Sequence, residues 1–395
     1  MDTAQHKQKI PRQVWMLGFV SLLMDTSSEL VHSLLPALFL SLGVSMSAVG
    51  LIEGIAEATA SIIKVFSGRL SDKLGKRKLL TVIGYGLGAL SKPLFPLAGS
   101  AGTVFAARFI DRIGKGIRGA PRDALIADVT ADTQRGAAYG LRQSLDTIGA
   151  LLGPSLAVIL MIYMANNIQH VLWFAAIPAV LCVIVLIVGV KEPVRKKTET
   201  VPVKPAKFRA DLKKLPSAYW ALVVVGGLFA LARFSEAFLA LHVLDNGLAI
   251  QWSPLVMILM NFVYSLSAFP IGKLADKWPR KPILALGLGF LVLSDLVLGL
   301  TTSIGMSAVG IVFWGLHMGL TQGVLSAMIA DVAPKHLRGT AFGMFNLVNG
   351  IGLLFASLIA GVIWQMVGGP MTFLFGAATA LCTLILLGLL QSQRR

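Results

Sequence analysis

Ten residues in one connection of the chain, Gly68-Arg-Leu-Ser-Asp72-Lys-Leu-Gly-Lys-Arg77, recur 204 residues later as Gly272-Lys-Leu-Ala-Asp276-Lys-Trp-Pro-Arg-Lys281. A second pair of segments shares nearly the same offset, because Ala127-Asp128 through Gly140 recurs 203 residues later as Ala330-Asp331 through Gly343. Two independent matches at one offset indicate an internal duplication. We therefore expect an architecture of two similar halves.

The sequence around these repeats is too apolar for a soluble protein. Of the 395 residues, 55% are hydrophobic and 14% are charged, and the mean hydropathy is +0.76. A helix that crosses a bilayer needs about 20 apolar residues. The sequence predicts an all-α integral membrane protein with twelve spans, at 14–42, 47–66, 78–98, 102–126, 137–164, 169–190, 217–243, 254–272, 282–301, 306–331, 340–366 and 371–391.

The distribution of Lys and Arg predicts the orientation of these helices. Six alternate connections contain neither residue, whereas the termini and the connections on the opposite side carry 26 of them. Cytoplasmic loops are the basic ones, so both termini are expected in the cytoplasm and the protein in the inner (plasma) membrane. A basic, proline-containing linker at 191–216 divides the chain into two six-helix groups, 1–190 and 217–395; contact with lipid headgroups is its alternative role.

The repeated connection resembles the signature loop of the major facilitator superfamily, and its copy lies where that family places the second one. Arg112-x-x-Lys115-Gly116 resembles the family's fourth-helix motif, with Lys115 and Arg118 in place of its usual Gln and Gly. Gly140-x8-Gly149-x3-Gly153-Pro154-x2-Ala157 resembles the fifth-helix motif of its drug/proton antiporters, with Ala157 replacing the last Gly. The resemblance implies two six-helix bundles related by a pseudo-twofold axis, with a solute pathway between them.

The charged residues of the repeated loops favour a conformational latch. An acid and several bases in a Gly-ended turn can pair with one another and with helix ends, and such pairs could break and re-form as the halves move. The alternative is a simple anchor on the cytoplasmic side. The expected latch consists of Gly68, Asp72, Lys73, Gly75, Lys76, Arg77, Gly272, Asp276 and Lys277.

Eighteen charged residues, nine of each sign, lie inside the predicted spans, although each costs about 3 kcal/mol or more against lipid. Helical periodicity places them on narrow faces that must turn inward. Carboxylates and imidazoles can exchange protons when their environment changes. The candidates for proton coupling are Asp25, Glu29, His32, Glu53 and Glu57, with Arg112 as counter-charge. A purely structural ion-pair network is the alternative, and a metal site at Asp25, Glu29 and His32 is a weaker one that we do not predict.

Further polar residues are expected to line a substrate cavity: Arg108, Asp111, Lys115, Arg118, Arg142 and Asp146 in the first half, and Arg233, Glu236, His317, Asn346 and Asn349 in the second. An occlusion element is expected in the fifth span, where small residues let helices approach closely and a proline can bend them. It consists of Gly140, Gly149, Gly153 and Pro154. Simple helix packing is the alternative for this element.

The sequence favours a transporter over an enzyme. It contains no phosphate-binding loop and no hydrolase motif, so neither direct use of ATP nor a cofactor is expected. The leading hypothesis is a monomeric secondary transporter that exports a small molecule in exchange for protons. Proton-coupled uptake of an anionic solute, such as an organic acid or a siderophore-like chelator, is the alternative, and a membrane sensor or intramembrane enzyme is the remote one. The net charge of +16 reflects topology rather than a nucleic-acid partner, since the charges inside the spans cancel.

Overall fold

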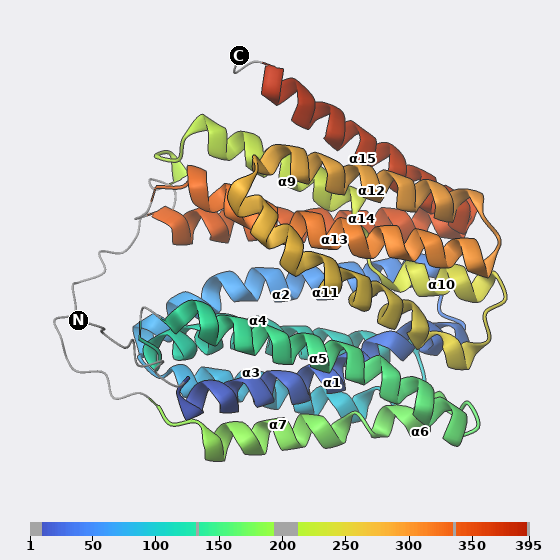
Figure 1. Ribbon diagram of the computed structural model, residues 1–395. Coiled ribbons are helices and arrows are strands. Elements are labelled where there is room, and N and C mark those ends of the chain that lie inside the picture. The colour runs from blue at the N-terminus through green and yellow to red at the C-terminus, as the bar shows by residue number, and fades with distance from the viewer. Residues whose placement is uncertain (1–9, 132–133, 193–211, 335–336, 393–395) are drawn as a thin grey trace, which may run out of the picture.

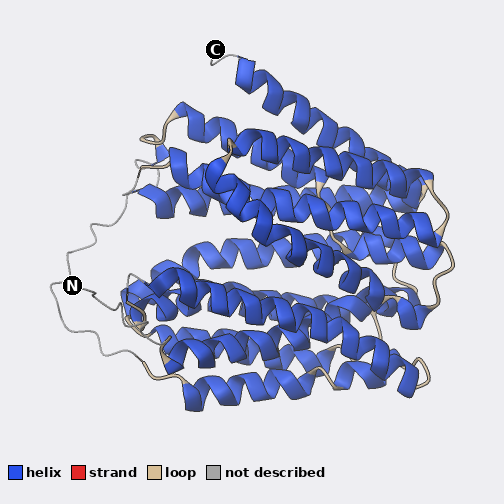
Figure 2. Cartoon of the chain, in the orientation of Figure 1, coloured by secondary structure: helices blue, strands red, loops and turns tan. Residues whose placement is uncertain are grey.

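The computed structural model describes residues 10–131, 134–192, 212–334 and 337–392, and over these ranges it contains helices and no strand (Figure 2). This confirms the predicted all-α class. The helices of the first half are α1 (Arg12–Ser41), α2 (Met46–Leu74), α3 (Arg77–Ser91), η1 (Lys92–Leu94), α4 (Ala101–Asp128), α5 (Arg135–Tyr163), α6 (Ile168–Trp173) and α7 (Ala176–Gly189).

Each predicted span coincides with one helix or with two consecutive helices. The helices of the second half are α9 (Ser217–Ala232), α10 (Ala237–Asp245), η3 (Ile250–Trp252), α11 (Pro254–Lys277), α12 (Arg280–Leu300), α13 (Ile304–Val332), α14 (Arg338–Val367) and α15 (Gly369–Ser392). The seventh span is interrupted, because residues 233–236 between α9 and α10 are not helical.

Nine helical segments of the described ranges are long and apolar enough to cross a membrane. The predicted spans that are not among them correspond to α2, α3 and α4. Helices α2 and α4 carry most of the charges of the first half, and α3 contains only 15 residues before it continues into η1. These helices therefore depend on the rest of the bundle to shield their polar faces.

Helix ends fall where the sequence supplies capping groups. The Ser45 side chain accepts a hydrogen bond from the Ala48 amide at the start of α2. Ser100 and Thr103 form a reciprocal capping box at the start of α4. Helix α2 ends at Gly75, which has a left-handed backbone with φ of 63°, a conformation that glycine adopts without steric cost. The glycine of the repeated loop is thus a helix terminator.

The two halves repeat one pattern of helix packing. In the first half α1 packs on α5, α2 on α4, and α3 on both α4 and α7. In the second half the equivalent contacts join α9 to α14, α11 to α13, and α12 to both α13 and α15. Contacts between the halves are also paired, because α2 packs on α14 and α5 packs on α11. Helices α2 and α11 lie between the two groups (Figure 1). This is the pseudo-twofold arrangement that the sequence repeat implies.

The contact between α2 and α14 is very close because small residues face each other. A β-carbon added to Gly50 would lie 2.2 Å from the carbonyl oxygen of Ser357 and 3.1 Å from the Cα of Gly361. A β-carbon added to Gly54 would lie 2.8 Å from the carbonyl oxygen of Leu354. Backbones that approach this closely gain dispersion contacts, which are the main attraction between helices in lipid.

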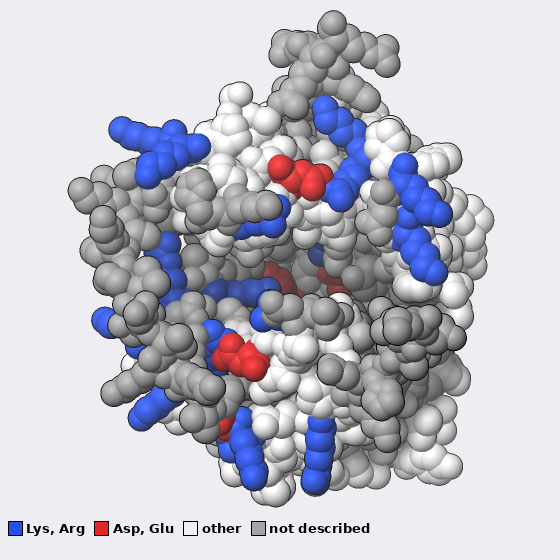
Figure 3. Space-filling model, turned by 60° about the vertical axis from the view of Figure 1, so that its left-hand side comes forward, with Lys and Arg blue, Asp and Glu red and all other residues white. Residues whose placement is uncertain are grey.

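The halves meet at one end of the bundle and separate at the other. We call the end where α2 meets α3, α4 meets α5 and α11 meets α12 the basic end. At the opposite end the Met46 amide donates to the Gln365 Oε1 at 3.0 Å, and the Ser253 hydroxyl donates to the Ser33 carbonyl at 3.4 Å. Figure 3 looks toward the basic end and shows a hollow between the halves, with Lys/Arg and Asp/Glu side chains inside it.

Candidate functional site

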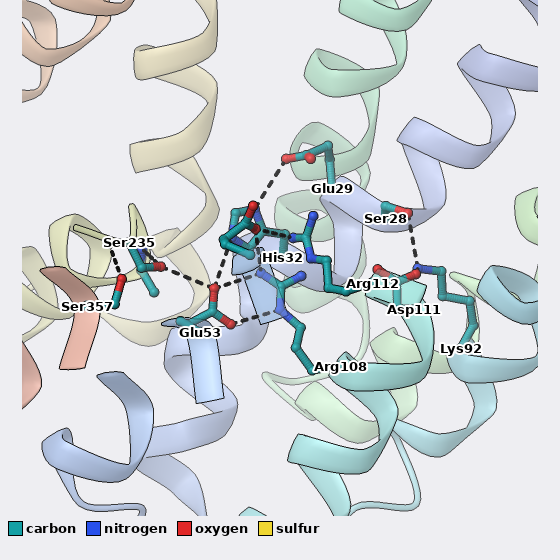
Figure 4. A network of polar contacts seen from close by, with 12 residues as sticks. Ser28, Glu29, His32, Glu53, Lys92, Arg108, Asp111, Arg112, Ser235 and Ser357 are labelled. Atoms are coloured by element: carbon teal, nitrogen blue, oxygen red, sulfur yellow. Dashed lines mark hydrogen bonds and ion pairs between the residues drawn. The ribbon is translucent and has the colours of Figure 1, made fainter. Parts of the chain in front are cut away.

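The centre of the polar network is a carboxylate at the boundary between the halves. Glu53 on α2 is fully buried, and Arg108 on α4 donates to both of its oxygens, from Nε to Oε1 at 2.8 Å and from Nη2 to Oε2 at 2.7 Å. Such a bidentate pair is strong and geometrically specific. Figure 4 shows how α1, α2 and α4 direct these side chains toward one another.

The second half contributes a hydroxyl to the same carboxylate. Ser235 lies in the interruption between α9 and α10, where its Oγ donates to Glu53 Oε2 at 3.1 Å and its amide donates to Ser357 Oγ at 3.1 Å (Figure 4). An uninterrupted helix would use that amide in its own ladder. The break in the seventh span therefore lets the second half bind Glu53 when the opposite end is closed.

His32 links this buried pair to a more exposed acid on α1. Its Nε2 lies 3.9 Å from Glu53 Oε2, and its Nδ1 lies 3.6 Å from Glu29 Oε2. Glu57 pairs with Arg112 at 3.1 Å. The side chains of Glu29 and Glu57 are 24% and 34% exposed, whereas that of Glu53 is 1% exposed. Five of the predicted proton-coupling residues, Glu29, His32, Glu53, Glu57 and Arg112, therefore lie in one chain of polar contacts that runs from partly exposed acids to the boundary between the halves. Asp25, the sixth, lies apart from this chain.

Two carboxyl groups face each other on α1 and α5. Both lie where α1 packs on α5, because a β-carbon added to Gly149, one turn after Asp146, would lie 3.1 Å from the Asp25 Cβ. Arg142 Nη1 lies 3.2 Å from Asp146 Oδ2. Two carboxylates that are both ionised repel each other when they are neighbours, so this position favours a state in which one of them carries a proton. The sequence predicted both residues at the site, Asp25 for coupling and Asp146 for the cavity, but not that they would meet.

Two residues that the sequence places in the cavity lie instead inside the first half. Asp111 on α4 is 2.8 Å from the Lys92 Nζ, which also donates to the Ser28 hydroxyl at 3.1 Å. The Arg118 guanidinium stacks 4.8 Å from the centre of the Tyr85 ring. Both residues are buried, because the polar face of α4 is wide enough to turn partly toward α3. They hold the first half together.

The remaining cavity candidates differ in how deeply they are buried. Lys115 is exposed, and Arg233, Glu236, Asn346 and Asn349 are half-buried. His317 differs from the prediction, because it is fully buried and its Nδ1 contacts the Gly287 carbonyl at 2.9 Å. The rings of Phe229 and Trp314 pack against it. Aromatic packing on α13 therefore keeps this imidazole in the core of the second half.

The repeated loops form matching contacts within each half. Arg77 pairs with Asp128 at 2.6 Å and donates to the Ala124 carbonyl at 2.8 Å. Arg280 pairs with Asp331 and donates to the Ala327 carbonyl. Lys73, Lys76 and Lys277 are exposed, Gly68 approaches Ala120, and Gly272 has open space beside it. The side chains of Asp72 and Asp276 lie outside the described residues, so a latch between the halves stays a prediction.

The glycines of α5 differ in how closely other helices approach them. A β-carbon added to Gly149 would lie 2.5 Å from the Leu22 carbonyl oxygen, and one added to Gly153 would lie 2.6 Å from that of Thr26. Gly140 faces open space, and α5 continues through Pro154. The close approach of α5 to α1 is thus present, whereas a role in occlusion stays a prediction.

Three features that position the site were not predicted from the sequence. Ser235 carries no charge, and its role depends on the helix break. The Gly50–Gly361 contact joins residues of different halves that no local motif relates. Glu192, in the chain after α7, accepts from the Arg77 and Lys78 amides at 2.8 Å each, which caps α3. The described residues contain no group of three His, Cys, Asp or Glu side chains placed to hold a metal ion.

Two repeated helical halves around a charged central hollow define the class of secondary membrane transporters, which move solutes without hydrolysing ATP. The model of the Major Facilitator Superfamily matches residues 17–260 and 237–395. The chain belongs to this family and is a multi-pass membrane transporter, not an enzyme.

Relatives and solved structures agree with this assignment. The chain is 32% identical over 393 residues to the uncharacterized MFS-type transporter MJ1317 of Methanocaldococcus jannaschii, covering 97% of this chain and 96% of the relative. It is 27% identical over 247 residues to the quinolone resistance protein NorA of Staphylococcus aureus, covering 62% and 61%. A crystal structure of the nucleoside transporter NupG superposes with a TM-score of 0.76 at 13% identity, covering 97% of this chain and 99% of that one, which shows a shared fold.

Proposed function

We propose that this transporter exports a small solute across the inner membrane in exchange for protons. The observation that carries the proposal is the position of Asp25 and Asp146 where α1 packs on α5. Neighbouring carboxylates that are both ionised repel each other, so the pair favours a state that holds one proton. Loss of that proton would push α1 and α5 apart or draw in a cation, which links proton binding to helix position.

The Glu53 network offers a way to transmit that event. Glu53 binds Arg108 of its own half and Ser235 of the other half. His32 stands between Glu53 and Glu29, so a proton on the imidazole could leave through the hollow, in the direction opposite to the exported solute. A protonated His32 is a second cation beside the Glu53 carboxylate, and loss of its proton would leave Glu53 with Arg108 and Ser235 alone. Proton release toward the hollow would then weaken the cluster at the boundary between the halves and favour opening of the closed end.

The predicted orientation assigns the conformation. The basic end carries Arg77, Lys78, Arg280 and Lys281, and the positive-inside rule places it in the cytoplasm. The hollow in Figure 3 then faces the cytoplasm, and the contacts of Met46 and Ser253 close the outer side. In this state an exporter takes up its cargo from the cell interior.

The direction of transport rests on similarity and on the fifth helix. The curated relatives include a protein named for quinolone resistance, a description that implies removal of a drug. The close packing of α5 against α1 at Gly149 and Gly153 lies beside Asp25 and Asp146. We propose that the exported solute binds in the hollow next to this carboxyl pair and leaves before the next proton enters.

One observation favours the second candidate, proton-coupled uptake of an anionic solute. Lys115 is exposed and has no ion-pair partner within the described part of the chain. Arg112, about one turn before Lys115 on α4, is buried and pairs with Glu57 at 3.1 Å. An ammonium group without an ion-pair partner attracts a carboxylate or phosphate. An organic acid could supply that carboxylate.

Inside-out and right-side-out proteoliposomes distinguish the two candidates. We expect ciprofloxacin, as a quinolone probe, to be taken up by inside-out vesicles when their lumen is acidic, with release of luminal protons to a pH-sensitive dye. Accumulation of citrate in right-side-out vesicles, driven by acid outside, would support uptake instead. Vesicles in which none of these solutes moves protons would contradict proton coupling of either kind for these solute classes.

Substitutions of Asp25 and Asp146 test the observation on which the proposal rests. Asp25→Asn and Asp146→Asn should each abolish proton release while the protein still binds the probe, because an amide cannot exchange the proton. Asp245→Asn is the matched control, since Asp245 is exposed at the end of α10, and it should transport like the unmodified protein. Unchanged proton release in both pair variants would refute the proposed role of the pair.

A further inference from the structure

A single carboxyl group lies deep in the second half without a partner. Asp295 on α12 is fully buried, and neither of its oxygens has a hydrogen-bond partner within the described residues. Native proteins leave few buried polar groups unpaired, so such an atom requires an explanation. The Glu53–Arg108 pair does not supply one, because it lies at the boundary between the halves.

Aromatic rings and a glycine enclose this carboxyl group. A β-carbon added to Gly376 on α15 would lie 2.6 Å from Asp295 Oδ2 and 3.0 Å from the nearest carbon of the Phe234 ring. The same ring packs on Phe373 and Trp314, with centroid distances of 5.4 Å and 5.6 Å. Gly376 thus leaves room for the carboxyl group, and Phe234 covers it.

This environment accommodates the neutral acid and not the ion. An ionised carboxylate needs a nearby cation or several hydrogen-bond donors when it leaves water, and the described residues give Asp295 neither. A protonated carboxyl group of the same shape needs far less stabilisation by cations or hydrogen-bond donors. The geometry therefore fits an acid that carries its proton in this conformation.

The neighbouring elements carry few groups that could respond to the charge of Asp295. On α13, His317 binds the Gly287 carbonyl, and on α10, His242 contacts the Asn246 side chain. The helix break contributes Arg233 and Glu236, and the Arg280–Asp331 pair lies at the basic end. Helix α15 contributes no acid, base or histidine over its described side chains. None of these groups forms an ion pair or a hydrogen bond with Asp295.

The helix break lies directly over this site. Phe234 is one of the non-helical residues at 233–236, between Arg233 and Ser235, so a change of the break that moves Ser235 away from Glu53 also moves the covering ring. Trp314 Nε1 and His317 Nε2 on the adjoining helix α13 are buried and lack hydrogen-bond partners. Three unsatisfied groups around one break indicate a second arrangement in which they find water or each other.

From these contacts we propose that Asp295 is a second proton-binding site, occupied when Phe234 covers it and emptied when the 233–236 segment rearranges and admits water or Arg233. The proposal rests on the proposed proton coupling. It adds a proton in the half of the molecule where the sequence predicts cavity and latch residues but no proton-coupling residue. The two halves would then each carry one proton-exchanging acid, at Asp25–Asp146 and at Asp295.

Infrared difference spectroscopy tests directly whether Asp295 carries a proton. The full-length protein in detergent at pH 7 is compared with Asp295→Asn, and the spectrum of the variant is subtracted from that of the unmodified protein. We expect a carbonyl band of a protonated carboxylic acid in the difference. A difference that contains carboxylate bands and no carboxylic acid band would overturn the proposal. Asp245→Asn is the control for an exposed aspartate and should remove carboxylate bands only.

A distance measurement tests the coupling of this proton to conformation. Spin labels at Ser41→Cys and Ala249→Cys, both exposed at the opposite end and in different halves, report its closure in a background with Cys182→Ala and Cys382→Ala. We expect the short-distance population of the otherwise unmodified protein to fall as the pH rises from 6 to 9. In Asp295→Asn, which mimics the neutral acid, the fall should be at least fivefold smaller. Equal pH dependence in both proteins would overturn the proposed coupling.

A second variant keeps the test independent of the folding of Asp295→Asn. Phe234→Ala removes the covering ring, so water should reach Asp295 and the short-distance population should fall at a lower pH than in the unmodified protein. No displacement of this transition would contradict the covering role of Phe234. If the proposed function is wrong, the vesicle experiments will show no solute-driven proton movement. That result would leave the infrared band of Asp295 unaffected, so the two failures can be told apart.

Discussion

Closure of the opposite end depends on the absence of a side chain at Gly50. In Gly50→Ala the new β-carbon would lie 2.2 Å from the carbonyl oxygen of Ser357, whereas carbon and oxygen atoms in close contact are about 3.3 Å apart. Helices α2 and α14 would have to separate by about 1 Å. The obstructing atoms belong to backbone, so no rotamer change relieves the clash.

The energetic cost of the Gly50→Ala clash weakens the contact between the halves. Overpacking a well-packed contact costs about 1–3 kcal/mol, which corresponds to a shift of roughly 5- to 150-fold in an equilibrium between two conformations. Because α2 and α14 belong to different halves, neither half has to unfold to release the strain. We therefore expect the variant to populate the conformation that is open at the opposite end.

The spin-label pair at residues 41 and 249 measures this shift. The short-distance population should decrease in Gly50→Ala and remain unchanged in Gly86→Ala, since a β-carbon added to Gly86 of α3 meets no atom within 4 Å. Both variants replace a helical glycine by alanine and so gain the same helix propensity. Equal distance distributions in the two variants would refute the view that this contact limits opening.

Three further substitutions follow from the same structure. Arg108→Ala leaves Glu53 buried and unpaired, so the unfolding free energy should fall by about 3–5 kcal/mol, and calorimetry should show partial recovery when Glu53→Gln is added; no recovery would mean that the pair is not the cause. Ser235→Ala removes one hydrogen bond between the halves, worth about 1 kcal/mol, and should reduce the short-distance population of the label pair about fivefold, while Ser326→Ala, on the exposed side of α13, should not change it. Glu192→Ala should destabilise the start of α3 by about 1–2 kcal/mol, seen as faster hydrogen exchange at the amides of residues 77 and 78; unchanged exchange there would show that Glu192 does not cap the helix.

The sequence was sufficient for the helices and for the likeness of the two halves. Spans of about 20 apolar residues leave the backbone no alternative to helix in a bilayer, and the 204-residue repeat predicts that both halves pack alike. The interruption at 233–236 was not predictable, because the local sequence Arg-Phe-Ser-Glu contains neither proline nor glycine. It depends on tertiary hydrogen bonds, from Ser235 to Ser357 and to Glu53.

The site was predicted as a set of residues but not as an arrangement. Periodicity grouped Arg108, Asp111, Arg112 and Arg118 on one face of α4, yet the neighbouring helices divide that face. Arg108 and Arg112 meet the acids of α2, whereas Asp111 meets Lys92 and Arg118 meets Tyr85. Helical periodicity gives the direction of a side chain about its own axis. It cannot identify the helix on the other side. Asp295 shows that an acidic residue can lie where no polar partner meets it among the described residues.

The matching loop contacts also bear on how the chain evolved. Arg77 and Arg280 each donate to a carbonyl 47 residues further along, on Ala124 and Ala327. A contact present in both copies is the trace expected of a duplicated six-helix unit. At the repeat offset of 204, Met257 and Asn261 occupy the positions that Glu53 and Glu57 hold in the first copy. Fusion into one gene freed the two copies to diverge, and the ion-pair chemistry became the specialisation of one of them.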